Sequence, residues 1–124
     1  MEKEMAQLLL PAGMLDHFEV VLVSWEEDSK DKYPVIKIHL EERNNPPSGY
    51  VRGELESKGF YQAKQVQDFP IRGKRVFLSI KRRRWRLTSD KNQSISNDYS
   101  YLTQGTKMTR ELSDFLKGTG GNPR

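Results

Sequence analysis

Hydrophobic residues alternate with polar ones in several parts of the chain, and this period of two predicts β-strands. Residues 18–25 (FEVVLVSW) are mostly apolar and β-branched, which is typical of an interior strand. Residues 33–42 place Ile36, Ile38 and Leu40 on one face, and Lys37, His39 and Glu41 on the other. Because only a short polar segment separates the two runs, they are predicted to form a β-hairpin.

A second hairpin is predicted from residues 60–69 and 74–87. The connecting Pro70-Ile71-Arg72-Gly73 suits a tight turn, since proline fits its start and glycine tolerates positive φ at its end. In the second strand, Val76, Leu78 and Ile80 share one face, which Arg82, Arg84 and Arg86 are expected to continue. The opposite face is expected to carry Phe77, Ser79, Lys81, Arg83 and Trp85.

Helical spacing of apolar residues occurs near both ends of the sequence. Residues 2–17 predict a helix interrupted at Pro11 and Gly13. Residues 107–117 predict another, because Met108, Leu112, Phe115 and Leu116 recur at i, i+4, i+7 and i+8, with Thr106 as a candidate N-cap.

Two polar segments, residues 44–59 and 88–101, are predicted to be loops. The expected fold is therefore α+β: a small antiparallel sheet of two β-hairpins flanked by N-terminal and C-terminal helices. Residues 1–117 are expected to form a single domain, and residues 118–124 a flexible tail.

Composition argues against several classes of function. The 124 residues include no cysteine, which excludes disulfides, cysteine-ligated zinc and a thiol nucleophile. His17 and His39 stand in no metal or catalytic motif, and the Arg-Gly-Lys at residues 72–74 lacks the spacing of a phosphate-binding loop. We therefore expect no enzyme, no cofactor and no metal. The acid-bearing N-terminal segment and the lack of a membrane-length apolar run predict a cytoplasmic protein.

Charge is distributed unevenly along the chain. Residues 1–43 contain ten acidic and five basic residues, a net charge of −5, whereas residues 71–86 contain eight basic residues and no acidic one. Such an asymmetry attracts a polyanion even though the formal net charge is only +4. The candidate nucleic-acid-binding residues are Arg72, Lys74, Arg75, Lys81, Arg82, Arg83, Arg84, Trp85 and Arg86.

Five of the six residues from Lys81 to Arg86 are cationic, and their mutual repulsion requires a counter-charge. One alternative is internal, an ion-pair network with the acidic N-terminal hairpin. The other is a nucleic acid, because arginine binds phosphate bidentately and Trp85 is able either to pack in the core or to stack on a base. The basic cluster alone does not distinguish DNA from RNA.

The order of four segments resembles the N-terminal region of ISAon-one family insertion-sequence transposases, over roughly residues 8–117. These segments are LLLPAGMLDHFEVV, IHLEE, LESKGFYQAKQVQDFPIRGKRVFLSIKRRRWR and TKMTRELSDFLK. The stretch DFPIRGKRVFLSIKRRRWR also resembles the zinc-binding N-terminal domain of the wider ISL-three transposase group. That group carries a cysteine pair at positions that correspond to Leu87 and Asp90, so its zinc site is not expected here.

The resemblance implies binding to DNA at the terminal inverted repeats of a transposon, with strand transfer performed by a separately encoded DDE transposase subunit. Lys107 and Arg110 are weaker candidates for contacts with the DNA backbone. Two alternatives remain open: a module that docks onto the DDE subunit through the acidic hairpin or through Leu112 and Phe115, and a general RNA-binding or nucleic-acid-binding module. The sequence leaves the oligomeric state open.

Overall fold

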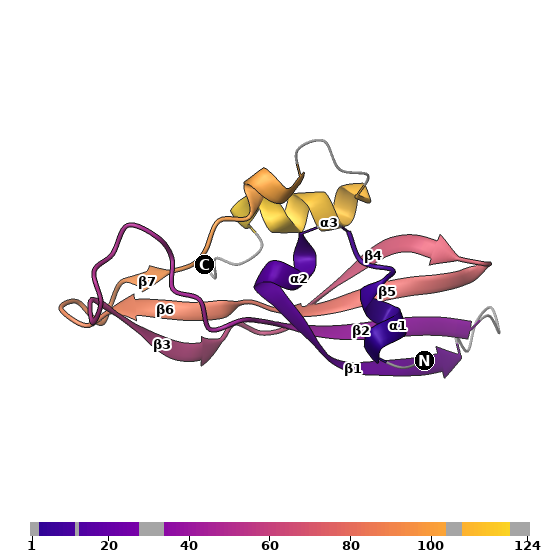
Figure 1. Cartoon of the computed structure of the whole chain (residues 1–124), viewed down its shortest axis with the longest axis horizontal. Coiled ribbons are helices and arrows are strands. Elements are labelled where there is room, and N and C mark those ends of the chain that lie inside the picture. Colours follow the sequence, from indigo (N-terminus) through magenta and orange to yellow (C-terminus); the bar gives the residue numbers. More distant parts are fainter. Residues whose placement is uncertain (1–2, 12, 28–33, 104–107, 120–124) are drawn as a thin grey trace.

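The chain folds into two β-sheets with short helices, which confirms the predicted α+β class (Figure 1). The computed structural model describes residues 3–11, 13–27, 34–103 and 108–119. Its strands are β1 (Phe18–Glu27), β2 (Pro34–Glu42), β3 (Leu55–Phe60), β4 (Lys64–Ile71), β5 (Lys74–Lys81), β6 (Arg83–Leu87) and β7 (Ser94–Ile95). Its helices are α1 (Lys3–Gln7), α2 (Met14–His17), the 3₁₀ helix η1 (Ser100–Thr103), α3 (Arg110–Asp114) and the π-helix η2 (Phe115–Thr119).

Both predicted hairpins are present. Strands β1 and β2 pair antiparallel, and so do β4 and β5. Arg72 and Gly73 form the turn between β4 and β5 with φ of 50° and 79°. Positive φ at both central residues is the geometry that matches the right-handed twist of a two-residue hairpin, so the glycine is required there.

The prediction of a purely antiparallel sheet was wrong. The larger sheet has the order β1-β2-β5-β4, and its two central strands, β2 and β5, pair parallel. Strand order depends on contacts between distant segments, which local periodicity does not report. A second, smaller sheet has the order β3-β6-β7.

The hydrophobic core lies between one face of the larger sheet and the helices. Ile36, Ile38, Leu78 and Ile80 from the two central strands are at most 1% exposed. They belong to one cluster with the helical residues Met14, Leu112 and Leu116 and with other apolar residues of the chain. The opposite face of the sheet carries the polar side chains Lys37, His39 and Glu41, as the alternation in the sequence predicted.

The C-terminal helical segment is part of this core. Leu112 is fully buried and Phe115 is 4% exposed, so neither side chain forms a docking surface. The described helix begins at Arg110, and Thr109 is its N-cap, because the Thr109 hydroxyl accepts a hydrogen bond from the Leu112 amide. Three of the predicted features lie outside the described residues: the N-cap Thr106, the cation Lys107 and residues 120–124 of the tail. The beginning of the predicted tail is helical, because η2 extends to Thr119.

Several boundaries differ from the sequence prediction; the strand predicted over residues 60–69, for example, is β4 at Lys64–Ile71. Strand β3 occupies residues 55–60, which were expected to be mostly loop, and β7 lies within the second predicted loop. The sequence of β3 (LESKGF) has few β-forming residues, so its conformation comes from pairing with β6. The long strand predicted over residues 74–87 is divided into β5 and β6 at Arg82.

Candidate nucleic-acid interface

The interruption at Arg82 determines which arginines face solvent. Buried positions alternate along β5 as Val76, Leu78 and Ile80, and Arg82 continues them at 1% exposure. The next buried residue is Trp85, an odd-numbered position, so the alternation shifts by one residue in β6. Arg84 and Arg86 therefore do not continue the face of Arg82, contrary to the sequence prediction.

Arg82 is a structural residue at the junction of the two sheets. Its Nη2 donates a hydrogen bond to the carbonyl oxygen of Asn97. Its guanidinium carbon lies 5.3 Å from the ring centroid of Tyr99 and 5.8 Å from that of Phe115. A guanidinium enclosed in this way cannot reach a phosphate, so the assignment of Arg82 to nucleic-acid binding was wrong.

Glu42 supplies negative charge at the same junction. Glu41 and Lys81 are the last paired residues of the parallel strands β2 and β5. Glu42 and Arg82 each follow by one residue, so they lie at neighbouring strand ends. Glu42 is 1% exposed. Its carboxylate accepts hydrogen bonds from the Tyr99 hydroxyl, from Asn97 Nδ2 at 2.8 Å and from the Arg83 amide at 2.9 Å.

The pKa of the Tyr99 hydroxyl is affected by its burial and by the charges at this junction. Burial and the adjacent Glu42 carboxylate raise the pKa of Tyr99 far above its ordinary value, while the Arg82 guanidinium opposes the shift. The tyrosine hydroxyl therefore stays protonated and remains a hydrogen-bond donor to Glu42. Glu42 thus places one carboxylate of the N-terminal hairpin at this part of the basic cluster, held by Tyr99, Asn97 and the Arg83 amide.

Arg83 is also engaged by the protein. Its Nη1 donates to the Ser57 hydroxyl at 3.0 Å, and its Nη2 donates to the Glu42 carbonyl oxygen at 3.3 Å. The guanidinium carbon lies 4.6 Å from the ring centroid of Phe60. These contacts tie β6 to β2 and β3, so Arg83 holds the small sheet against the larger one and is not free to bind phosphate.

Trp85 packs inside the protein. It pairs with Ser57 of β3 and Ile95 of β7, and only 3% of it is exposed. Of the two sequence-based interpretations, core packing is therefore the one that the structure supports. Trp85 does not present its ring for stacking on a base.

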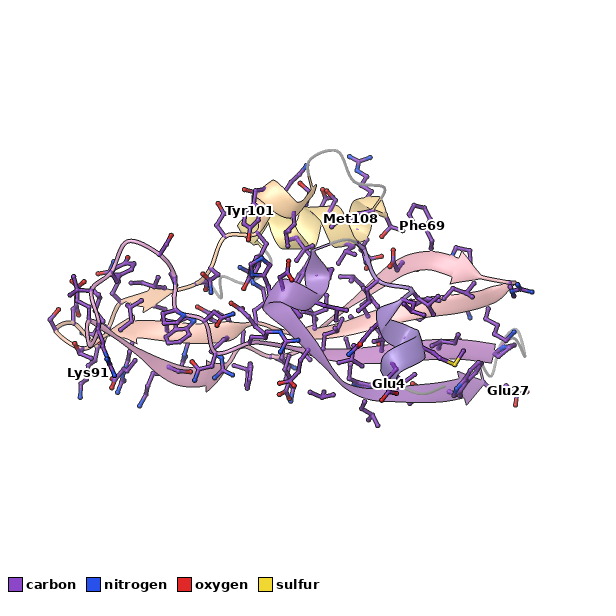
Figure 2. All side chains as sticks on the ribbon, viewed as in Figure 1. Glu4, Glu27, Phe69, Lys91, Tyr101 and Met108 are labelled. Atoms are coloured by element: carbon purple, nitrogen blue, oxygen red, sulfur yellow. The ribbon has the colours of Figure 1, made fainter. Side chains whose placement is uncertain are left out.

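The outer face of the small sheet is where exposed positive charge gathers. Arg86 pairs with Glu56 across β6 and β3, and Arg84 lies two residues away on the same face of β6. Lys58 follows Glu56 by two residues, and Lys91 belongs to the turn between β6 and β7. The basic face is defined here as Lys58, Arg84, Arg86 and Lys91; the side chains of Lys58, Arg84 and Lys91 are exposed. Figure 2 labels Lys91 at the far end of this sheet.

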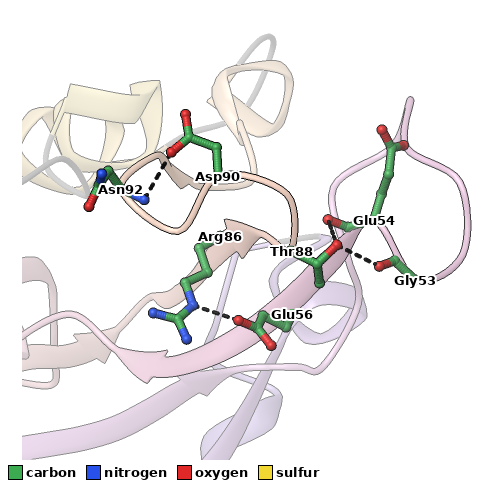
Figure 3. A network of polar contacts seen from close by, with 7 residues as sticks. All are labelled: Gly53, Glu54, Glu56, Arg86, Thr88, Asp90 and Asn92. Carbon is green, nitrogen blue, oxygen red and sulfur yellow. Dashed lines mark hydrogen bonds and ion pairs between the residues drawn. The ribbon is translucent and has the colours of Figure 1, made fainter.

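Glu56 is a carboxylate within the basic face. Arg86 Nε lies 2.6 Å from Glu56 Oε1 in a half-buried ion pair (Figure 3). The hydrogen bond from Arg86 lowers the pKa of Glu56, and the positive charges of Arg86, Lys58 and Lys91 lower it further. Arg86, Lys58 and Lys91 therefore all contribute positive charge around Glu56.

The remaining candidates lie elsewhere and do not form one track with the basic face. Arg72 and Lys74 lie at the β4–β5 turn, at the opposite end of the elongated molecule from β7 (Figure 1). The Arg75 guanidinium carbon lies 6.0 Å from the Phe77 ring centroid. Lys81 is exposed but pairs with Glu41 on the open face of the larger sheet, and Arg110 lies 3.9 Å from Asp114.

Other chemistry has little structural support in the described part of the chain. His17 Nε2 lies 2.7 Å from the Tyr101 hydroxyl, and His39 Nε2 lies 3.4 Å from the Ser24 hydroxyl. No group of three or more metal-binding side chains occurs among the described residues. None of the described helices is long and apolar enough to cross a lipid bilayer.

Comparison with known proteins finds no matching family model, no matching curated protein and no matching solved structure.

Sequence reasoning missed Lys58 and Lys91 because both lie in segments that were predicted to be loops. It also missed Glu42, Asn97 and Tyr99 as partners of the arginines, since 55 residues separate Glu42 from Asn97. One signal was available: Glu42 ends an apolar alternating strand at a position with the parity of Ile36, Ile38 and Leu40, which predicts burial.

Proposed function

We propose that this chain is a non-enzymatic DNA-binding module that contacts the phosphate backbone through its basic face. The observation that carries the proposal is the exposed Arg84, which lies on one sheet face with Arg86 and across from the β3 segment that contains Lys58. A small set of cations on a rigid sheet binds a polyanion because each contact releases condensed counterions. The face is presented by strands, whose positions are fixed by Arg83 and Trp85 beneath them.

The resemblance to ISAon-one family transposases adds a target to this proposal. The DNA would be the terminal inverted repeats of an insertion sequence, and a separately encoded DDE subunit would carry out strand transfer. The module would then work in the cytoplasm and associate with the nucleoid when it is bound to DNA. The buried Arg82 and Trp85 would support the site from behind without touching the DNA.

The proposal is tested by measuring the affinity of the chain for a short DNA duplex across a series of salt concentrations. Three phosphate contacts from Lys58, Arg84 and Lys91, and a fourth where Arg86 leaves Glu56, predict that log K falls against log salt with a slope of about −3 to −4. Arg84→Gln should weaken binding about fivefold and reduce the magnitude of the slope by about one. Absence of binding to any duplex at low salt would contradict the proposal.

Glu56→Gln is the matched control, because it changes charge on the same face in the opposite direction. It removes the carboxylate that holds Arg86, and we expect binding to tighten rather than weaken. Duplexes with and without a transposon terminal repeat then separate general backbone binding from recognition of a specific end. Stronger binding to single-stranded RNA than to any duplex would favour the RNA-binding alternative.

A further inference from the structure

Helix α1 and the residues after it direct apolar side chains toward solvent. Ala6 is fully buried against the core, whereas Met5 is 57% exposed, Leu8 is 84% exposed and Leu9 is 39% exposed. A short surface helix ordinarily buries its apolar side and exposes its polar side. Here part of the apolar side is left without a partner in the described part of the chain.

These side chains line a pocket at the end of the larger sheet that carries the β4–β5 turn. Trp25 of β1, itself 47% exposed, and Ile71 of β4 also line it. The cavity volume is about 320 Å³, within the range of ligand-binding pockets. Arg72 and Lys74 contribute the charged groups of the lining, and none of the described lining residues is acidic.

The apolar and basic residues that line the pocket indicate which kind of partner would bind in it. Apolar walls beside two cations match a helix that carries leucine-like side chains on one face and carboxylates next to them. An anionic lipid surface fits less well, because it is wide enough to meet the exposed Glu4 of α1 and Glu27 of β1 as well. A single helix seated in the pocket meets only Arg72 and Lys74 as charged lining groups.

A second copy of this chain also fits less well as the occupant. Its Met14, Leu112 and Leu116 are buried in its own core, so α2, α3 and η2 have no comparable apolar face to offer. Apposing two copies of the pocket would bring the Arg72 and Lys74 side chains of both molecules together, and like charges in contact are unfavourable.

We propose that the pocket between α1 and the β4–β5 turn is a docking site for an acidic amphipathic helix of a partner protein. This surface lies at the opposite end of the molecule from β7 and the basic face, so both are accessible at the same time (Figure 1). The chain would thus bind DNA with one end and a protein with the other. This inference does not depend on the DNA-binding proposal.

The test uses a synthetic helical peptide with leucines along one face and glutamates flanking them. Trp25 is half exposed and Trp85 is buried, so acrylamide quenching of tryptophan fluorescence reports mainly on Trp25. We expect the peptide to protect Trp25 from the quencher in a saturable manner. Leu8→Asp should weaken peptide binding at least about tenfold, without loss of fold because the side chain is already exposed.

Two controls distinguish binding in the pocket from non-specific binding of the peptide to the protein surface. Val51→Asp changes another exposed apolar residue, 72% exposed, in the segment before β3, and should leave peptide binding unchanged. The double variant Arg72→Glu, Lys74→Glu should lose the glutamate peptide and gain the matched lysine peptide.

The docking proposal is wrong if the glutamate peptide leaves Trp25 accessible, or if the lysine peptide binds the unmodified chain equally well. Self-association or binding to anionic vesicles that Leu8→Asp abolishes, without peptide binding, would also overturn it. DNA affinity is measured in the same variants. Loss of peptide binding with unchanged DNA affinity shows that the two surfaces are independent.

Discussion

Replacing Glu42 by glutamine is expected to lower the free energy of unfolding by about 3–5 kcal/mol, the usual consequence of removing one partner of a buried charge network. The variant keeps the shape of the side chain but places an amide NH₂ among groups that donate hydrogen bonds, the Tyr99 hydroxyl, Asn97 Nδ2 and the Arg83 amide. It also removes the negative charge from the junction that encloses Arg82. Chemical denaturation followed by circular dichroism measures the loss.

Glu41→Gln is the control for this result. Glu41 is the preceding residue of the same strand, but it lies on the open face of the larger sheet, where the change should cost less than about 0.5 kcal/mol. A loss of under about 1 kcal/mol for Glu42→Gln would show that the junction between the sheets does not depend on this carboxylate.

Replacing Trp85 by alanine is expected to cost about 3–5 kcal/mol, because it removes a large side chain from a site that is 3% exposed. The same change at Trp25, the other tryptophan, should cost much less, since Trp25 is 47% exposed. Thermal or chemical unfolding of the two variants measures the difference.

The conservative variant Trp85→Phe separates packing from base stacking. It should leave DNA affinity unchanged, because the Trp85 ring lies on the opposite side of β6 from Arg84. A fall in DNA affinity with little loss of stability would instead place this ring at the nucleic acid.

The Glu42 and Trp85 variants bear on function because they separate the residues of the basic cluster that support the fold from those that are proposed to contact DNA. Arg82 and Arg83 connect the two sheets, and Trp85 fills the interior of the smaller one. Arg84 and Arg86 are thereby held on the outer face. A variant that changes Arg82 and Arg84 together would lose DNA binding through unfolding, so only substitutions at the exposed positions report on the interface.

Local pattern was sufficient for the parts of the fold that depend on neighbouring residues. The alternation in β2 and β5 predicted both hairpins, and Gly73 predicted the turn between β4 and β5. Strand β3 was not predictable in this way, because its sequence is polar and its pairing with β6 comes from the tertiary structure.

The candidate site was predicted less well, for a physical reason. A run of arginines in the sequence predicts a uniformly charged surface. The break at Arg82 shifts the alternation by one residue, so that the buried position in β6 is odd-numbered, whereas the buried positions in β5 are even-numbered. Which cation is enclosed depends on Glu42, Asn97 and Tyr99, residues that are brought to Arg82 only by the parallel pairing of β2 with β5 and by the segment after β7.

The most direct test of the account is to map a bound DNA duplex onto the chain by NMR. The prediction is that the largest changes in backbone amide shifts occur at Lys58, Arg84 and Lys91 of the basic face, and that they diminish as salt is raised. Changes centred on the β4–β5 turn at Arg72 and Lys74, with the small sheet unaffected, would contradict it.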